Sequence, residues 1–77
     1  MMENVNSPNH YTSKSLEAIK VIAVMVENLD PFEAYCMGNI IKYLYRYEEK
    51  NGIEDLEKAK KHINLMIEER GSNDFSD

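Results

Sequence analysis

The spacing of apolar residues predicts a first helix in the N-terminal half of the chain. Apolar side chains recur at near-helical intervals at Leu16, Ile19, Ile22, Met25, Val26 and Leu29. This pattern favours a helix over about residues 15 to 28. The same segment is rich in β-branched residues, which would also suit a buried strand.

A second helix is predicted to begin at a proline. Asp30 is a good N-cap, Pro31 suits the first helical position, and Glu33 is spaced to bond back to the cap. The helix is expected to end before Gly52, because glycine adopts the left-handed conformation at low cost. Its expected extent is about residues 31 to 50.

A third helix is expected over about residues 53 to 70. Acidic residues fill its first turns and Arg70 stands in its last turn, which suits the helix dipole at both ends. Gly71 is expected to end it. Its apolar stripe comprises Leu56, Ala59, Ile63, Met66 and Ile67, and a polar flank comprises Asp55, Lys58, His62 and Glu69.

The two ends of the chain lack helical periodicity. Residues 1–14 are polar and turn-prone around Pro8, so an irregular arm is expected. Residues 71–77 have too little apolar content to pack and are expected to be disordered. The 77 residues therefore predict one all-α domain, a three-helix protomer with an irregular N-terminal arm.

The second predicted helix is the most apolar, and its composition favours self-association. Nine residues cover about 200° of its circumference, so the helix is expected to be central and buried. A chain this short buries only about 60% of its surface, and its single cysteine excludes a disulfide framework. A homo-oligomer is therefore expected. The nine residues are Ala34, Cys36, Met37, Gly38, Ile40, Ile41, Leu44, Tyr45 and Tyr47.

The remaining arc of this helix carries cations, an amide and phenols within about 100°. Such a surface suits a phosphorylated aromatic ligand, although a solvated face is the ordinary alternative. Cations spaced four residues apart repel by a few tenths of a kcal/mol, which a bound anion would offset. Gly38 costs about 1 kcal/mol in a helix interior and indicates close approach of a ligand or, more commonly, of another helix. The arc comprises Tyr35, Asn39, Lys42, Tyr43, Arg46 and Lys50.

Overall charge limits the partners of such a surface. The net charge is −5, from 14 acidic and 9 basic residues, which disfavours binding to a nucleic-acid polymer but still allows a small anionic ligand. No signal peptide is recognisable and no apolar run approaches about 18 residues. No membrane partner is expected, and a cytoplasmic location is predicted.

Other candidate chemistry is less specific. His10 is either an ordinary surface side chain or a donor to phosphate with Tyr11 stacking on a base, and spacing alone does not choose. Acidic residues paired three apart, at Glu27 and Asp30 and again at Glu54 and Glu57, faintly resemble magnesium-binding pairs of all-helical pyrophosphatases. Such pairs are common on exposed helices, so no metal site is predicted. Cys36 is expected in the core, no phosphate-binding glycine loop is present, and no catalytic residue is identified.

Several segments together resemble a known family. They are AsnHisTyr at 9–11, GlyAsnIleIleLysTyrLeuTyrArgTyr at 38–47, Lys50 with its AsnGly, and GluAspLeuGluLysAla at 54–59. This combination is similar to a small, mostly phage-encoded family of unknown function that includes the T7-type phage nucleotide kinase. The resemblance implies a protein that binds or acts on nucleotides in a bacterial host cytoplasm. It adds Asp55 and Lys58 to the candidate site.

Three functions remain open at this point. The preferred one is nucleotide binding, in which the protein sequesters a nucleotide signal of bacterial antiviral defence. The alternative is a nucleoside monophosphate kinase of the T7 phage type, which would use Mg²⁺ as a cofactor. A pyrophosphatase-like or protein-interaction module is the third. The expected ligand-binding residues are His10, Tyr11, Asn39, Lys42, Tyr43, Arg46, Lys50, Asp55 and Lys58.

Overall fold

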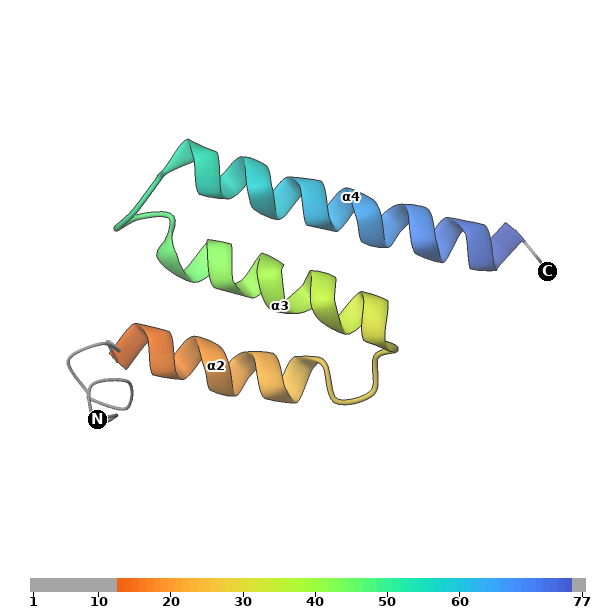
Figure 1. Ribbon diagram of the computed structural model, residues 1–77, viewed down its shortest axis with the longest axis horizontal. Coiled ribbons are helices and arrows are strands. Elements are labelled where there is room, and N and C mark those ends of the chain that lie inside the picture. The colour runs from red at the N-terminus through yellow and green to blue at the C-terminus, as the bar shows by residue number, and fades with distance from the viewer. Residues whose placement is uncertain (1–12, 76–77) are drawn as a thin grey trace, which may run out of the picture.

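Residues 13–75 fold as three helices joined by short turns (Figure 1). The computed structural model describes residues 13–75, with side chains for residues 13–72. Helix α2 spans Ser13–Met25, α3 spans Pro31–Arg46 and α4 spans Ile53–Phe75. Within this range there is no strand, so the predicted all-α class is confirmed. Residues 1–12, and with them His10 and Tyr11, lie outside the described part.

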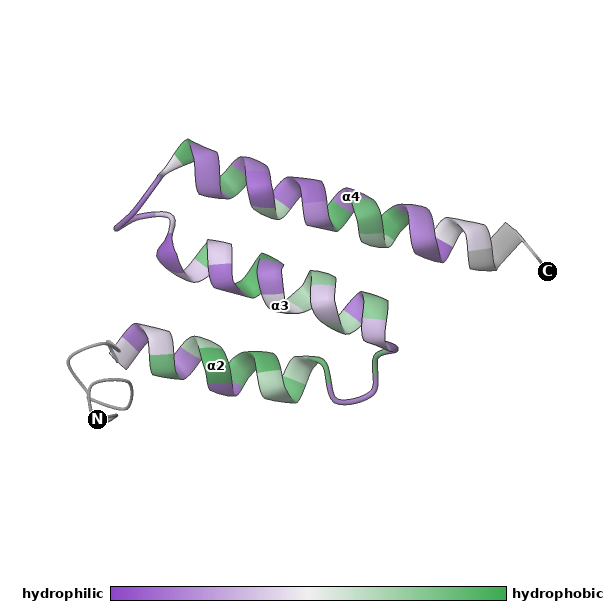
Figure 2. Cartoon of the chain, viewed as in Figure 1, coloured by the Kyte–Doolittle hydropathy of each residue, from purple (hydrophilic) through white to green (hydrophobic). Residues whose placement is uncertain are grey.

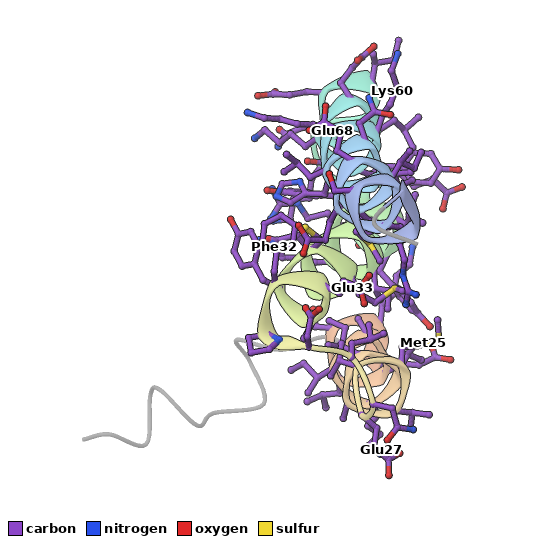
Figure 3. The ribbon with its side chains drawn as sticks, turned by 90° about the vertical axis from the view of Figure 1, so that its right-hand side faces the viewer. Met25, Glu27, Phe32, Glu33, Lys60 and Glu68 are labelled. Atoms are coloured by element: carbon purple, nitrogen blue, oxygen red, sulfur yellow. The ribbon has the colours of Figure 1, made fainter. Side chains whose placement is uncertain are left out.

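The three helices lie side by side in one layer with α3 in the middle (Figure 1). Helix α3 packs against both neighbours, whereas α2 and α4 do not contact each other. Viewed along the long axis, the helices form a single row (Figure 3). The predicted central position of α3 is therefore confirmed, but both broad faces of the layer are left open in the described chain.

The start of α3 is fixed by the predicted cap. Asp30 has extended backbone angles and its Oδ1 accepts the backbone N–H of Glu33 at 2.8 Å, with Pro31 in the first turn. The predicted hydrogen bond between the Glu33 side chain and the cap residue Asp30 is not formed. The Glu33 carboxylate accepts instead from Arg70 of α4, with 2.7 Å to Nε and 3.3 Å to Nη2. A charged bidentate pair is stronger than a bond to a neutral backbone amide.

Helices α2 and α3 both end earlier than the sequence pattern predicts. Helix α2 was expected to reach residue 28 and α3 residue 50, but the chain there forms hydrogen-bonded turns. Leu29 N–H bonds to the Val26 carbonyl at 3.1 Å, and Glu49 N–H to the Arg46 carbonyl at 3.0 Å. These tighter turns satisfy carbonyls that a helix end leaves unpaired. The left-handed glycine predicted in the second connection is confirmed, with φ of 55° at Gly52.

The outer ends of α2 and α4 extend further than expected. Helix α2 begins at Ser13, so the predicted irregular arm loses its last two residues, 13 and 14. Helix α4 runs to Phe75, so Gly71 does not end it and the predicted disordered tail is helical up to that residue. A glycine ends a helix when it adopts positive φ, and among the described residues only Gly52 does so.

The core of the layer is small. Its buried apolar residues are Ala18, Cys36, Ile40, Ile41 and Ala59. The expected burial of α3 holds for Cys36, Ile40 and Ile41, whereas Leu44 is 46% exposed. In the predicted α4 stripe Ile67 is 61% exposed. Helix α2 is mostly hydrophobic along its second half (Figure 2), yet only Ala18 in it is buried. A single layer covers just one side of each outer helix.

Replacing the cap tests this account of α3. Asp30→Ala removes the oxygen that accepts Glu33 N–H, and we expect it to lower the free energy of unfolding by about 1 kcal/mol. Urea denaturation followed by far-UV circular dichroism measures this change. Asp30→Ser is the control, because its hydroxyl still accepts the bond. An equal loss in both variants would contradict the capping role.

Candidate functional site

A groove between α2 and α3 is the main concave feature of the described residues. Its volume is about 580 Å³, within the range of about 300–1,000 Å³ that is usual for small-molecule sites. Four cationic side chains line it together with small apolar residues. The cations are Lys14, Lys42, Arg46 and Lys50, and the other lining residues are Ser15, Ala18, Ile19, Ile22, Ala34, Tyr35, Gly38, Asn39, Tyr45 and Glu49.

Gly38 lies in the groove where α3 approaches α2. A Cβ added at this position would meet Ile22 Cγ2 at 3.6 Å, which is ordinary van der Waals contact. Helix packing therefore does not require glycine here, although helix crossing was its commoner explanation. Gly38 also lines the groove, where its backbone is not covered by a side chain of its own.

The predicted cations differ in how their charges are compensated. Lys58 pairs with Glu54 at 3.5 Å, and Arg46 pairs with the carboxylate of Asp55. Lys42 and Lys50 form no ion pair with any residue in the described range. Acidic side chains of the described residues therefore do not compensate these two groove lysines.

Tyr43 gathers cations around its ring. Lys42 Nζ lies 4.8 Å from the ring centroid, Arg46 Cζ 5.3 Å and Lys58 Nζ 5.8 Å. The electron-rich face of a phenol attracts such cations, and this contact holds them near one another despite their repulsion. Of the predicted site residues, the structure therefore brings together Lys42, Tyr43, Arg46 and Lys58.

One end of the Asn39 side chain is hydrogen-bonded within its own helix. Its side-chain amide nitrogen donates to the Tyr35 carbonyl at 2.9 Å. An asparagine side chain has donor and acceptor ends, so its oxygen remains available in the groove that it lines. Asn39 is therefore suited to accept a hydrogen bond from a ligand more than to donate one.

Asp55 does not face the groove. Its side chain is fully buried and its oxygens accept four hydrogen bonds. Arg46 donates from Nε at 3.3 Å and from Nη2 at 3.4 Å, and Asn51 donates from its backbone at 3.3 Å and its side chain at 3.4 Å. Asp55 thus contacts Arg46, which itself lines the groove, and the predicted ligand contact of Asp55 stays a prediction.

These bonds decide the charge of the buried carboxyl. Burial alone would raise the pKa of Asp55, but the hydrogen bonds from Arg46 and Asn51 outweigh burial and lower it. Asp55 is therefore ionised at neutral pH. A guanidinium has five N–H donors, and Asp55 takes two from Arg46, which leaves about three for a ligand.

His62 is the site residue that the sequence prediction missed. Its ring lies between those of Tyr35 and Tyr43, with centroid distances of 5.7 and 5.8 Å. Its Nδ1 lies 2.9 Å from the Lys58 carbonyl, and because a carbonyl only accepts, Nδ1 carries the hydrogen. The polar flank that includes Asp55 and Lys58 was the available signal, because His62 belongs to it.

The acidic pairs do not form a metal site in this protomer. Asp30 caps α3 and Glu54 pairs with Lys58. Within residues 13–75, no three side chains of His, Cys, Asp or Glu gather to hold a metal. Cys36 is buried as expected, and burial together with the nearby Glu33 and Glu69 raises the pKa of its thiol, which disfavours the reactive thiolate.

No helix in the described range is long and apolar enough to cross a bilayer.

The Asp55 cluster predicts how stability depends on pH. A carboxyl with a lowered pKa in the folded state adds stability above its unfolded value of 3.8. That stability is lost as the pH falls through the lower folded pKa. We expect Asp55→Asn to be less stable than the wild type at pH 7, with a gap that narrows toward pH 2.

Urea denaturation across this pH range measures the gap. Glu57→Gln is the matched control, since it removes an exposed acid of α4 that has no ion pair within the described residues. Identical pH profiles for Asp55→Asn and the wild type would contradict the role of the cluster.

Comparison with known proteins agrees with the resemblance found in the sequence. Residues 5–64 match the family model described as Protein of unknown function (DUF3310). The chain is 38% identical to the Gene 1.7 protein of Enterobacteria phage T3 over 73 residues, covering 88% of this chain and 44% of that protein. It is 41% identical over 58 residues to a protein of Escherichia phage T7 named Nucleotide kinase gp1.7, covering 74% and 29%.

The chain thus spans less than half the length of these curated relatives. No solved structure matches it. The family model covers most of the chain, and its matched relatives are phage proteins. The protein belongs to the DUF3310 family.

Proposed function

We propose that this protein binds a phosphorylated nucleotide in the groove between α2 and α3. The proposal rests on one observation, that the cationic side chains of Lys42 and Arg46 both line that groove. Lys42 has no acidic partner among the described residues, and Arg46 keeps about three N–H donors after binding Asp55. Phosphate oxygens match such donors in charge and geometry.

The remaining groove residues suit the other parts of a nucleotide. Lys50 adds a third cation to the same helix face, and an anion between these cations would offset their mutual repulsion. Ile22 and Ala34 provide apolar surface for a base. The Asn39 oxygen is a hydrogen-bond acceptor for a base or ribose.

The N-terminal arm is proposed to complete this site. Lys14 lines the groove at the start of α2, and Tyr11 is three residues before it in the sequence. Three residues span at most about 11 Å, which is close enough for Tyr11 to stack on a bound base. His10 is proposed to donate to phosphate from the same arm or from that of a neighbouring copy.

The name of the T7 relative supports a nucleotide as the ligand, because that protein is named a nucleotide kinase. Phosphoryl transfer is the second candidate function for this chain. It requires placed cations and usually Mg²⁺, and Mg²⁺ commonly binds through substrate phosphates and one or two carboxylates. Asp55 is occupied by Arg46 and Asn51, so it does not supply such a carboxylate. This favours binding without turnover, as in sequestration of a nucleotide signal of antiviral defence.

We also propose that the protein forms a homo-oligomer. Large apolar side chains remain exposed on both outer helices of the layer, including Val24 and Met25 of α2 and Ile63 and Ile67 of α4. Large exposed apolar patches on soluble proteins commonly mark interaction sites. A second copy of the same layer would cover these side chains.

Lys42→Gln tests the proposed phosphate contact. A hydrogen bond to a charged group contributes about 1.5–3 kcal/mol, so we expect at least about a tenfold loss of affinity. Isothermal titration calorimetry with ATP, GTP and cyclic di-GMP measures it. Arg46→Ala is less informative, because it also leaves the buried Asp55 carboxylate without its partner.

Lys60→Gln is the control, because Lys60 lies at the outer edge of α4, away from α3 (Figure 3). An equal affinity loss in both variants would indicate a nonspecific charge effect and contradict the proposal. Sequestration and kinase activity are separated by incubating the protein with ATP, a nucleoside monophosphate and Mg²⁺. Chromatography after denaturation then shows intact ligand for sequestration, or a new nucleoside diphosphate for a kinase.

A further inference from the structure

We infer that the protomer carries a second base-binding surface, formed by Tyr35, Tyr43 and His62 on the α4 side of Lys42 and Arg46. The ligand would then present two nucleobases, one in the groove against α2 and one on this aromatic surface, with phosphate between them. This inference rests on the proposed function and specifies the class of ligand.

The aromatic surface is built from two helices. Tyr35 and Tyr43 come from α3 and His62 from α4, with the imidazole 5.7 Å from one phenol and 5.8 Å from the other. The rings are tilted by 54° and 44°, so they do not cover one another. Tyr35 is 60% exposed. Partly open aromatic rings are the surfaces on which nucleobases stack, at about 1–3 kcal/mol per base.

The same two cations serve both surfaces. Lys42 and Arg46 line the groove against α2, yet their charged ends lie 4.8 and 5.3 Å from the ring of Tyr43. A phosphate bound by them therefore has an apolar groove on one side and aromatic rings on the other. Lys58 adds a third cation on the α4 side, 5.8 Å from the same ring.

The polar atoms of this second surface are held in place. His62 Nδ1 donates to the Lys58 carbonyl at 2.9 Å, which fixes the imidazole ring. Its Nε2 bonds to no residue of the described segment, so it is available to the edge of a base. The Asp55 carboxylate likewise holds Arg46 in place, by accepting hydrogen bonds from its Nε and Nη2.

Two kinds of ligand share this chemistry. One is a single molecule with two bases joined through phosphate, such as a cyclic dinucleotide. The other is a pair of mononucleotides bound side by side with their phosphates on the shared cations. The first predicts one molecule per protomer and the second predicts two.

Calorimetry with GTP and with cyclic di-GMP tests the inference on the full chain. For wild type we expect either two GTP or one cyclic di-GMP per protomer. Tyr43→Leu keeps an apolar side chain at the position but removes the aromatic face. It should reduce the number of bound GTP molecules to one per protomer. Alternatively, it should lower the affinity for cyclic di-GMP by at least about fivefold, because about 1 kcal/mol of stacking free energy is lost.

Tyr47→Leu is the matched control, because Tyr47 directly follows α3 and its ring makes no aromatic contact with His62 and no cation–π contact within the described residues. His62→Asn is a second variant, which removes the ring and keeps a polar side chain, and it should reproduce the Tyr43→Leu result. Far-UV circular dichroism and solution mass establish that each variant keeps its fold and assembly.

The outcomes separate the two proposals. Failure of wild type to bind any nucleotide would overturn the proposed function and the inference together. One GTP per protomer in wild type, unchanged in Tyr43→Leu and His62→Asn, would overturn the inference alone. Loss of one site in both variants with Tyr47→Leu unaffected would support it.

Discussion

The buried carboxylate of Asp55 is the interaction on which the rest of this protein depends. It joins Arg46 at the end of α3, Asn51 in the turn and α4 itself. A buried charge is costly unless it is fully paired, so these partners are required together. The same bonds that set α4 against α3 also orient Arg46, which lines the groove.

A second ion pair acts toward the opposite ends of the two helices. Glu33 is 4% exposed and binds Arg70, which lies far from it in the sequence. Between the two pairs the core consists of a few small or medium residues. Specific polar contacts therefore fix how α4 lies on α3, while apolar burial in one protomer is modest.

The single-layer arrangement gives the two broad faces different characters. By helical geometry, Ile67 lies about 180° around α4 from Lys58. On α4, this exposed apolar side chain and the cation near the Tyr43 ring therefore lie on opposite sides. Exposed apolar surface suits a second copy of the chain. The groups that suit a phosphorylated ligand lie on the opposite face. This arrangement supports self-association through one face and ligand binding on the other.

Local signals in the sequence predicted local structure well. The proline and cap at Asp30 predicted the start of α3, and helical periodicity brought Lys42, Tyr43 and Arg46 together on one side. Contacts between helices could not be predicted from the sequence in the same way. The partner of Glu33 and the place of His62 depend on how α4 aligns with α3, and no local pattern encodes that alignment. Gly71 has the residue type of a helix end but not the positive φ that makes one.

Backbone amide mapping by NMR tests whether the cationic and aromatic face binds nucleotide. In a titration of the ¹⁵N-labelled full chain with GTP, we expect saturable shifts at Gly38, Lys42 and Tyr43. Ile63 and Ile67, which line the apolar hollow near Arg70, should remain unchanged. Shifts confined to that hollow, or no saturable shift at any residue, would contradict nucleotide binding at the cationic and aromatic face.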